Sequence, residues 1–277
     1  MDLSPKTKSR EQIRADEIAD RPDDITERSD EKQVFGSEPL TYAEAMKEAD
    51  GLFYRGEYRG ALRLYSRAMQ LDKTKAEPWV GQILSQLLLS RIRDAMVWVR
   101  QGMLVFFDHP VLTSLHGLVL ALDRRAAEGL RRSNEALAQG EADLLCRIIH
   151  GWVLLEAKDR RWDSYFSELM RSCPAGAWRM RTLMGLALER HGKWVRAAAC
   201  YEAAAAANPI NAFLWRRLEF CYAKAGYPRK AFGARRKAER PVPSSDGKEQ
   251  ILPRTNALVW IGGILSRLIR IFSRESR

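Results

Sequence analysis

The chain has 277 residues with 46 Lys and Arg against 35 Asp and Glu, a net charge of +11, and 46% of its residues are hydrophobic. No segment alternates polar and apolar residues as a half-buried strand does, so we expect an all-α protein large enough to bury a continuous core. The sequence lacks a Gly-x-Ser-x-Gly elbow, a His-Glu-x-x-His pair and a Gly-Lys-Ser/Thr phosphate loop. It therefore predicts a protein that is not an enzyme and that uses no cofactor.

Residues 1–41 are predicted to be a disordered, charged leader. They carry seven Lys and Arg against eleven Asp and Glu, with few apolar side chains and no sustained helical stripe. No basic start is followed by an apolar run, so we expect no cleaved signal peptide.

From residue 42 to residue 245 one pattern recurs every 34 residues. Its eighth position holds Gly117, Gly151 and Gly185, and its twentieth holds Ala or Gly in five of the six blocks. Two helices approach closely only where side chains are small, so small residues at a fixed phase indicate one helical hairpin stacked on copies of itself. The six predicted hairpins are 42–75, 76–109, 110–143, 144–177, 178–211 and 212–245.

The conserved-looking positions of these blocks resemble the tetratricopeptide repeat family. The residues that carry the likeness in the first and fifth blocks are Gly56, Glu57, Tyr58, Ala61, Tyr65, Ala68, Gly185, Gly192, Ala197, Tyr201, Ala204 and Pro209. The resemblance covers about three quarters of the chain and implies a right-handed α-solenoid of about six stacked helix-turn-helix hairpins. It also implies a protein-protein interaction scaffold, adaptor or chaperone-like module.

Two blocks depart from the family pattern. Block two has Ile83 and Gln86 where the family prefers Gly and Tyr. Block four has polar residues in its second helix where the pattern needs apolar ones. We therefore expect that helix to be shifted, with a buried stripe made of Trp162, Phe166 and Leu169.

Cysteine and histidine are the candidate metal ligands. The four cysteines never form a Cys-x-x-Cys pair and fall in predicted helices, so buried thiols and a reducing, cytoplasmic location are expected. His116 and His150 lie 34 residues apart at equivalent positions, but no Cys, Asp or Glu completes a ligand set on the same face. We therefore predict no metal site.

Positive charge is concentrated in the last two blocks, which hold 14 Lys and Arg against 4 Asp and Glu. In the resembled family, the second, fifth, ninth, twelfth and thirteenth positions of each first helix point into a concave groove that holds a peptide. Carried onto this chain, these positions predict an apolar and then basic groove made of Val80, Leu84, Leu87, Leu88, Leu118, Leu122, Leu145, Ile148, Trp152, Leu155, Arg179, Arg190, Phe213, Arg216, Phe220 and Lys224.

Such a groove suits a protein or peptide partner with an apolar anchor and an acidic segment or free carboxylate. Two alternatives stay open. In the first, the leucines pack on neighbouring repeats and the arginines are solvated. In the second, the basic cluster from Arg229 to Arg240 makes the chain a nucleic-acid-associated scaffold; we disfavour nucleic acid because the nearby aromatic residues fall at packing positions. A third possibility outside direct binding is a regulatory subunit of a separate enzyme.

A linker, 246–255, precedes an apolar segment at 256–272 that is too short to span a bilayer. Its spacing predicts a basic amphipathic helix. The residues expected to contact a membrane or a partner helix are Leu258, Trp260, Ile261, Ile264, Leu265, Arg267, Leu268, Arg270, Ile271, Phe272 and Arg274. This helix either lies on an anionic membrane surface at the cytoplasmic side, caps or fills the solenoid, or docks on a partner helix.

Overall fold

The computed structural model describes residues 40–139 and 143–240, and within these ranges every regular element is an α-helix. The helices are α3 (Tyr42–Phe53), α4 (Tyr58–Leu71), α5 (Glu77–Leu88), α6 (Ile92–Val105), α7 (Pro110–Leu122), α8 (Ala126–Ala138), α9 (Leu144–Glu156), α10 (Trp162–Ser172), α11 (Trp178–Arg190), α12 (Trp194–Ala207), α13 (Ala212–Lys224) and α14 (Pro228–Ala238). The predicted leader up to residue 39, the linker 246–255 and the amphipathic segment 256–272 lie outside the described residues.

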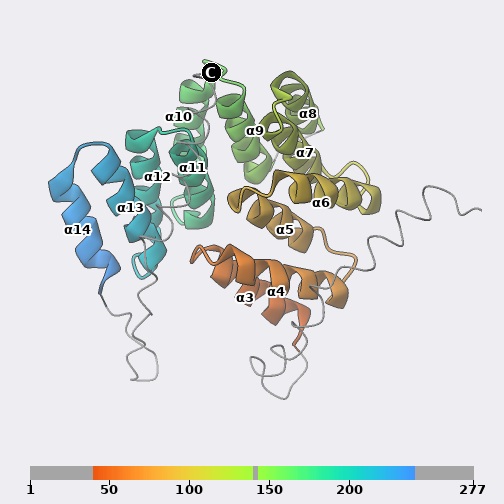
Figure 1. Cartoon of the computed structure of the whole chain (residues 1–277), viewed down its shortest axis with the longest axis horizontal. Helices are drawn as coiled ribbons and strands as arrows, with labels where there is room; N and C mark the ends of the chain where they lie inside the picture. The colour runs from red at the N-terminus through yellow and green to blue at the C-terminus, as the bar shows by residue number, and fades with distance from the viewer. Residues whose placement is uncertain (1–39, 140–142, 241–277) are drawn as a thin grey trace, which may run out of the picture. The chain divides into compact units, whose positions relative to one another are not determined.

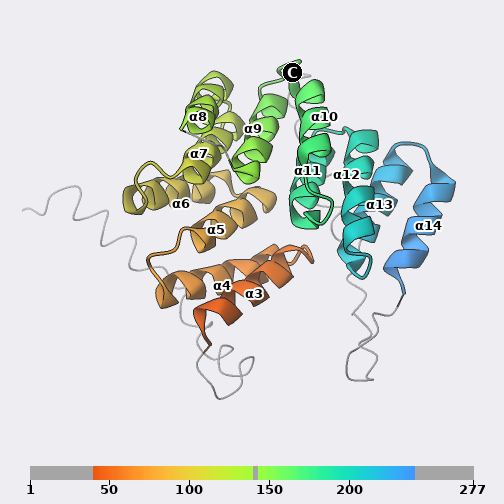
Figure 2. The ribbon, with the colours of Figure 1, turned by 180° about the vertical axis from the view of Figure 1, so that it is seen from behind.

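The chain divides into two compact units, residues 1–136 and 137–277. In the first unit, coloured orange to yellow-green in Figure 1, α3 packs on α4, α4 on α5, α5 on α6 and α6 on α7. In the second, α9 packs on α10 and α11, and α11 through α14 each pack on the next helix. The view from behind in Figure 2 shows the same order of neighbours from α11 to α14. The predicted all-α stack of helical hairpins is confirmed within each unit.

The turn inside every described hairpin contains one residue in the left-handed region. Gly56, Gly192 and Gly226 take it with φ of 83°, 68° and 81°, where glycine carries no steric penalty. The other three hairpins force Ser90, Arg124 and Lys158 into the same region, with φ of 61°, 67° and 54°. These six residues are spaced 34 apart along the chain, so the sequence period is also a period of backbone conformation.

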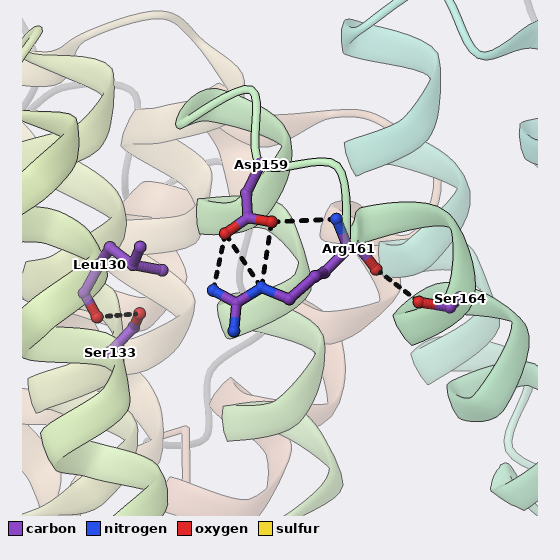
Figure 3. A network of polar contacts seen from close by, with 5 residues as sticks. All are labelled: Leu130, Ser133, Asp159, Arg161 and Ser164. Atoms are coloured by element: carbon purple, nitrogen blue, oxygen red, sulfur yellow. Dashed lines mark hydrogen bonds and ion pairs between the residues drawn. The ribbon is translucent and has the colours of Figure 1, made fainter.

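Small residues set how closely the two helices of a hairpin approach. A Cβ on Gly117 of α7 would lie 2.7 Å from the carbonyl oxygen of Gly129 on α8 and 3.0 Å from the backbone nitrogen of Ser133. Ser133 is fully buried, and its Oγ donates to the carbonyl oxygen of Leu130, 3.1 Å away (Figure 3). In the α11–α12 hairpin a large residue fills the space instead, because a Cβ on Gly185 would meet the ring of Tyr201 at 2.6 Å.

The second helix of the fourth hairpin begins late. α10 starts 18 residues after the start of α9, whereas α12 starts 16 residues after the start of α11. The added turn is held by Asp159, whose carboxylate accepts from the backbone nitrogen of Arg161 at 2.9 Å and pairs with its guanidinium (Figure 3). Phe166 and Leu169 are buried as expected from the shifted stripe, but Trp162 is only half-buried.

None of the helices in the described ranges combines the length and the apolar character needed to cross a bilayer.

Candidate functional site

The basic end of the chain is built by the first helices of the last two hairpins, α11 and α13. Arg190 and Lys224 occupy equivalent positions, 34 residues apart, in the last turns of these helices. A cation there also interacts favourably with the partial negative charge of a helix C-terminus. We call the set Arg179, Arg190, Arg216 and Lys224 the basic face; all four side chains are exposed.

A buried ion pair joins the two helices beneath this face. Glu189 of α11 is 8% exposed, and its carboxylate accepts from Nε of Arg217 on α13 at 2.9 Å and from the hydroxyl of Tyr201 at 2.9 Å. A charge in this position is tolerated only when it is paired and hydrogen-bonded, as it is here. The pair therefore sets the position of α13 against α11.

Aromatic rings surround the guanidinium of Arg217. Its Cζ lies 5.9 Å from the centre of the Phe213 ring and 5.5 Å from that of Phe220. Phe220 also meets Trp194 edge-on, with ring centres 5.7 Å apart, and Lys224 Nζ lies 5.7 Å from its centre. Such contacts hold cations at a partly apolar surface, where they attract anions more strongly than in bulk water.

A second acidic residue faces the basic end of α11. Glu156, at the end of α9, lies 3.0 Å from Nε2 of His191 and 3.4 Å from Nε of Arg190. Burial of Glu156 disfavours its ionisation, but the hydrogen bond with His191 and the charges of His191 and Arg190 outweigh that effect and lower its pKa below 4.5. Arg190 is thus already paired within the protein.

The structure corrects the apolar half of the predicted groove. Seven of its side chains are at most 9% exposed and pack inside the protein, where they are out of reach of a partner: Leu84, Leu87, Leu118, Ile148, Trp152, Leu155 and Phe213. The reason is that these helices are covered by neighbouring helices on more than one side, so an inward position is a core position. Five others are half-buried: Val80, Leu88, Leu122, Leu145 and Phe220.

The basic half of the prediction falls on accessible side chains with different surroundings. Arg179 lies over the ring of Trp178, with its Cζ 5.5 Å from the ring centre. Arg216 makes one long hydrogen bond, 3.4 Å, to the carbonyl oxygen of Ala212 in its own helix. The residues assigned to a membrane or partner helix between 256 and 274 lie outside the described ranges.

Several residues of the site were missed by sequence reasoning. Glu156 and Glu189 stand at the thirteenth and twelfth positions of their blocks, which are groove positions, so a positional signal existed. We expected only apolar and basic residues to contribute there. Arg217 stands at the sixth position, and only the structure shows that it reaches Glu189 of the preceding hairpin.

The candidate metal ligands have packing roles. His150 is buried against Tyr165, with ring centres 5.2 Å apart, and all four cysteines are buried thiols outside any disulfide. Burial raises the pKa of Cys200 and of Cys221 to about 12, so both are inert at neutral pH.

Comparisons with known proteins establish the fold. Neither a family model nor a curated protein matches the sequence. Among solved structures, a monomeric mutant of IFIT1 with m7Gppp-AAAA matches with a TM-score of 0.51 and 16% identity, over 77% of this chain and 53% of that chain. YrrB, described as a TPR protein with an unusual peptide-binding site, matches with a TM-score of 0.35 and 16% identity, over 63% of this chain and 90% of that chain.

The chain has the tetratricopeptide repeat (TPR) fold. It spans about half the length of IFIT1, and a second IFIT1 structure, with Gppp-AAAA, gives a TM-score of 0.50 at 16% identity. In this TPR fold the first helices of successive hairpins carry the basic face described above.

Proposed function

We propose that the protein is an interaction scaffold whose second unit binds an acidic segment of a partner protein on the basic face. The observation that carries the proposal is the exposure of Arg216 and Lys224, which are not paired with a carboxylate among the described residues. In the same hairpins the carboxylates Glu156 and Glu189 are paired with other cations. The exposed charge of α13 is therefore available to an external anion.

The partner's acidic groups meet the basic face at two kinds of contact. Arg216 presents a planar guanidinium, which suits bidentate binding of a carboxylate. Lys224 presents a point charge close to the half-buried ring of Phe220. An apolar side chain of the partner that packs on this ring would bring its acidic residues within reach of both cations, so the apolar anchor is smaller than the sequence implied.

The buried thiols support a reducing compartment, and we place the protein in the cytoplasm. Attachment to a membrane surface through residues 256–272 stays a proposal that rests on the sequence.

A fluorescent peptide with one leucine followed by six glutamates tests the proposal. We expect it to bind the full-length protein with an affinity that falls as salt rises. Reversing both charges, by Arg216→Glu with Lys224→Glu, should weaken binding by about tenfold or more, equivalent to about 1.4 kcal/mol.

The matched control is Arg59→Glu with Arg63→Glu on α4, where both arginines are exposed and the change in net charge is the same. An equal loss of affinity in the two double variants would mean that the peptide senses only net charge, and the basic face would not be its site.

A further inference from the structure

The outer face of α14 differs from the equivalent faces of earlier hairpins. In α12 the side turned toward the next hairpin carries Ala198, Tyr201 and Ala205, which are 3%, 0% and 0% exposed. In α4 the same positions carry Leu62, Tyr65 and Met69, at 9%, 2% and 8%. Both helices pack on the first helix of the following hairpin, α13 and α5 respectively.

In α14 these positions hold Phe232, Arg235 and Glu239. Phe232 is 63% exposed, and Arg235 and Glu239 form an exposed ion pair at 3.1 Å. Two of the three apolar positions have thus become charged, so this face could not bury another hairpin as α4 and α12 do. An exposed phenyl ring remains on an otherwise polar helix.

Cations flank the Phe232 ring on both sides along the helix. Arg229 lies three residues before it and Arg236 four residues after it, spacings that put all three on one side of a helix. Both arginines are exposed, and neither is paired with a carboxylate among the described residues. The hairpin of α13 and α14, residues 212–240, holds nine Lys and Arg against two Asp and Glu.

We propose that the outer face of α14 binds single-stranded nucleic acid, with a base stacked on Phe232 and the adjacent phosphates paired with Arg229 and Arg236. The two arginines are separated by about 10 Å along the helix axis, at 1.5 Å per residue. Their long side chains can therefore reach phosphates on either side of one stacked base. Tyr227, 46% exposed at the start of the helix, offers a second ring.

A nucleic acid fits this face better than an acidic protein segment does. Each nucleotide supplies both an aromatic ring and an anion, and the helix offers rings and cations in alternation. An acidic peptide would satisfy the arginines but would leave the Phe232 ring without a stacking partner. The surface is also separate from Arg216 and Lys224, so the two proposals can fail independently.

The probe is a fluorescein-labelled 20-nucleotide oligo(U), titrated with full-length protein at several salt concentrations. Each phosphate contact to a single strand contributes about 0.7 to the slope of log K against log salt. Arg229→Ala with Arg236→Ala should therefore reduce that slope by about 1.4. Phe232→Ala should weaken binding by about tenfold, and Phe232→Trp should restore it, because stacking depends on the ring.

Two controls match these variants. Phe107→Ala removes an aromatic side chain that is 87% exposed in the first unit, and Arg59→Ala with Arg63→Ala removes two exposed arginines from α4. Neither should change the affinity for oligo(U) as much as the α14 variants do. Melting temperatures should be unchanged by Phe232→Ala, since its ring is exposed.

Three results would overturn the proposal. A hexaglutamate peptide that competes as well as oligo(U) would assign the face to an acidic protein. Equal affinity for a 20-base-pair duplex, with Phe232→Ala without effect, would reduce it to a nonspecific basic surface. A lowered melting temperature in Phe232→Ala, without loss of binding, would mean that the ring is covered by another part of the chain.

Discussion

Arg217 of α13 and Glu189 of α11 form a buried ion pair that crosses from one hairpin to the preceding one. The Nε of Arg217 donates to a carboxylate oxygen 2.9 Å away, and Tyr201 of α12 donates its hydroxyl to the same oxygen. Three consecutive helices of the second unit therefore meet at one carboxylate. The packing of the basic face depends on this contact, since Arg216 is the neighbour of Arg217 in α13.

Removing the acidic partner should destabilise the protein strongly. Glu189→Ala leaves the guanidinium of Arg217 without its counter-charge in a half-buried place, which costs about 3 kcal/mol. Urea unfolding monitored by circular dichroism measures the change. The control is Glu239→Ala, which breaks an exposed pair with Arg235 and should cost less than about 1 kcal/mol. Similar losses for both variants would show that burial of the Glu189 pair has no special weight.

Stability should fall between pH 6.5 and pH 4 because of His150. Burial, with the nearby charge of Arg161, lowers the pKa of His150 from 6.5 to about 4. The unfolded chain binds a proton in this range and the folded chain does not, so stability is full above pH 6.5 and declines as the pH falls toward 4. The pKa difference corresponds to about 3 kcal/mol.

Unfolding midpoints in urea at intervals from pH 7 to pH 4 measure this dependence. In His150→Gln the decline between pH 6.5 and pH 4 should be much shallower, whatever the stability of the variant at pH 7. A decline as steep as that of the unmodified protein would assign it to other groups. Glu156, whose pKa is lowered, contributes its own decline only below about pH 4.5, where the folded state begins to take up the proton.

Two glycine-to-alanine changes should have opposite signs. Gly117→Ala puts a Cβ 2.7 Å from a backbone oxygen of α8, which cannot move without displacing the helix, and should cost about 2 kcal/mol or more. A Cβ on Gly233 of α14 would meet nothing within 4 Å. Gly233→Ala should therefore stabilise by up to about 1 kcal/mol, the gain in helix propensity. Thermal melts of the two variants compare them, and equal destabilisation would show that the close α7–α8 approach is not what Gly117 provides.

The repeat architecture was largely predictable from the sequence because small residues at fixed spacing report directly on helix contacts. The period also located the left-handed turn at Gly56, but not at Ser90, Arg124 and Lys158, where the hairpin imposes that conformation on residues that do not favour it. The late start of α10 was visible in its stripe through Phe166 and Leu169.

The candidate site was less predictable. Positions that face inward in one hairpin are covered by its neighbours to different degrees, so Leu118 is fully buried while Leu122, one helical turn later, is half-buried. The Glu189–Arg217 pair links residues 28 apart in different hairpins, and a periodic pattern of single residues does not report such a pairing.

A charge swap tests the central claim most directly. The double variant Arg216→Glu with Lys224→Glu should lose the leucine–hexaglutamate peptide and gain a leucine–hexalysine peptide that the unmodified protein does not bind. Fluorescence anisotropy with the four combinations of protein and peptide at one salt concentration gives the answer. Recovery of binding in the swapped pair is the expected result, whereas binding of hexaglutamate unchanged by the reversal would place the acidic partner elsewhere and contradict the account.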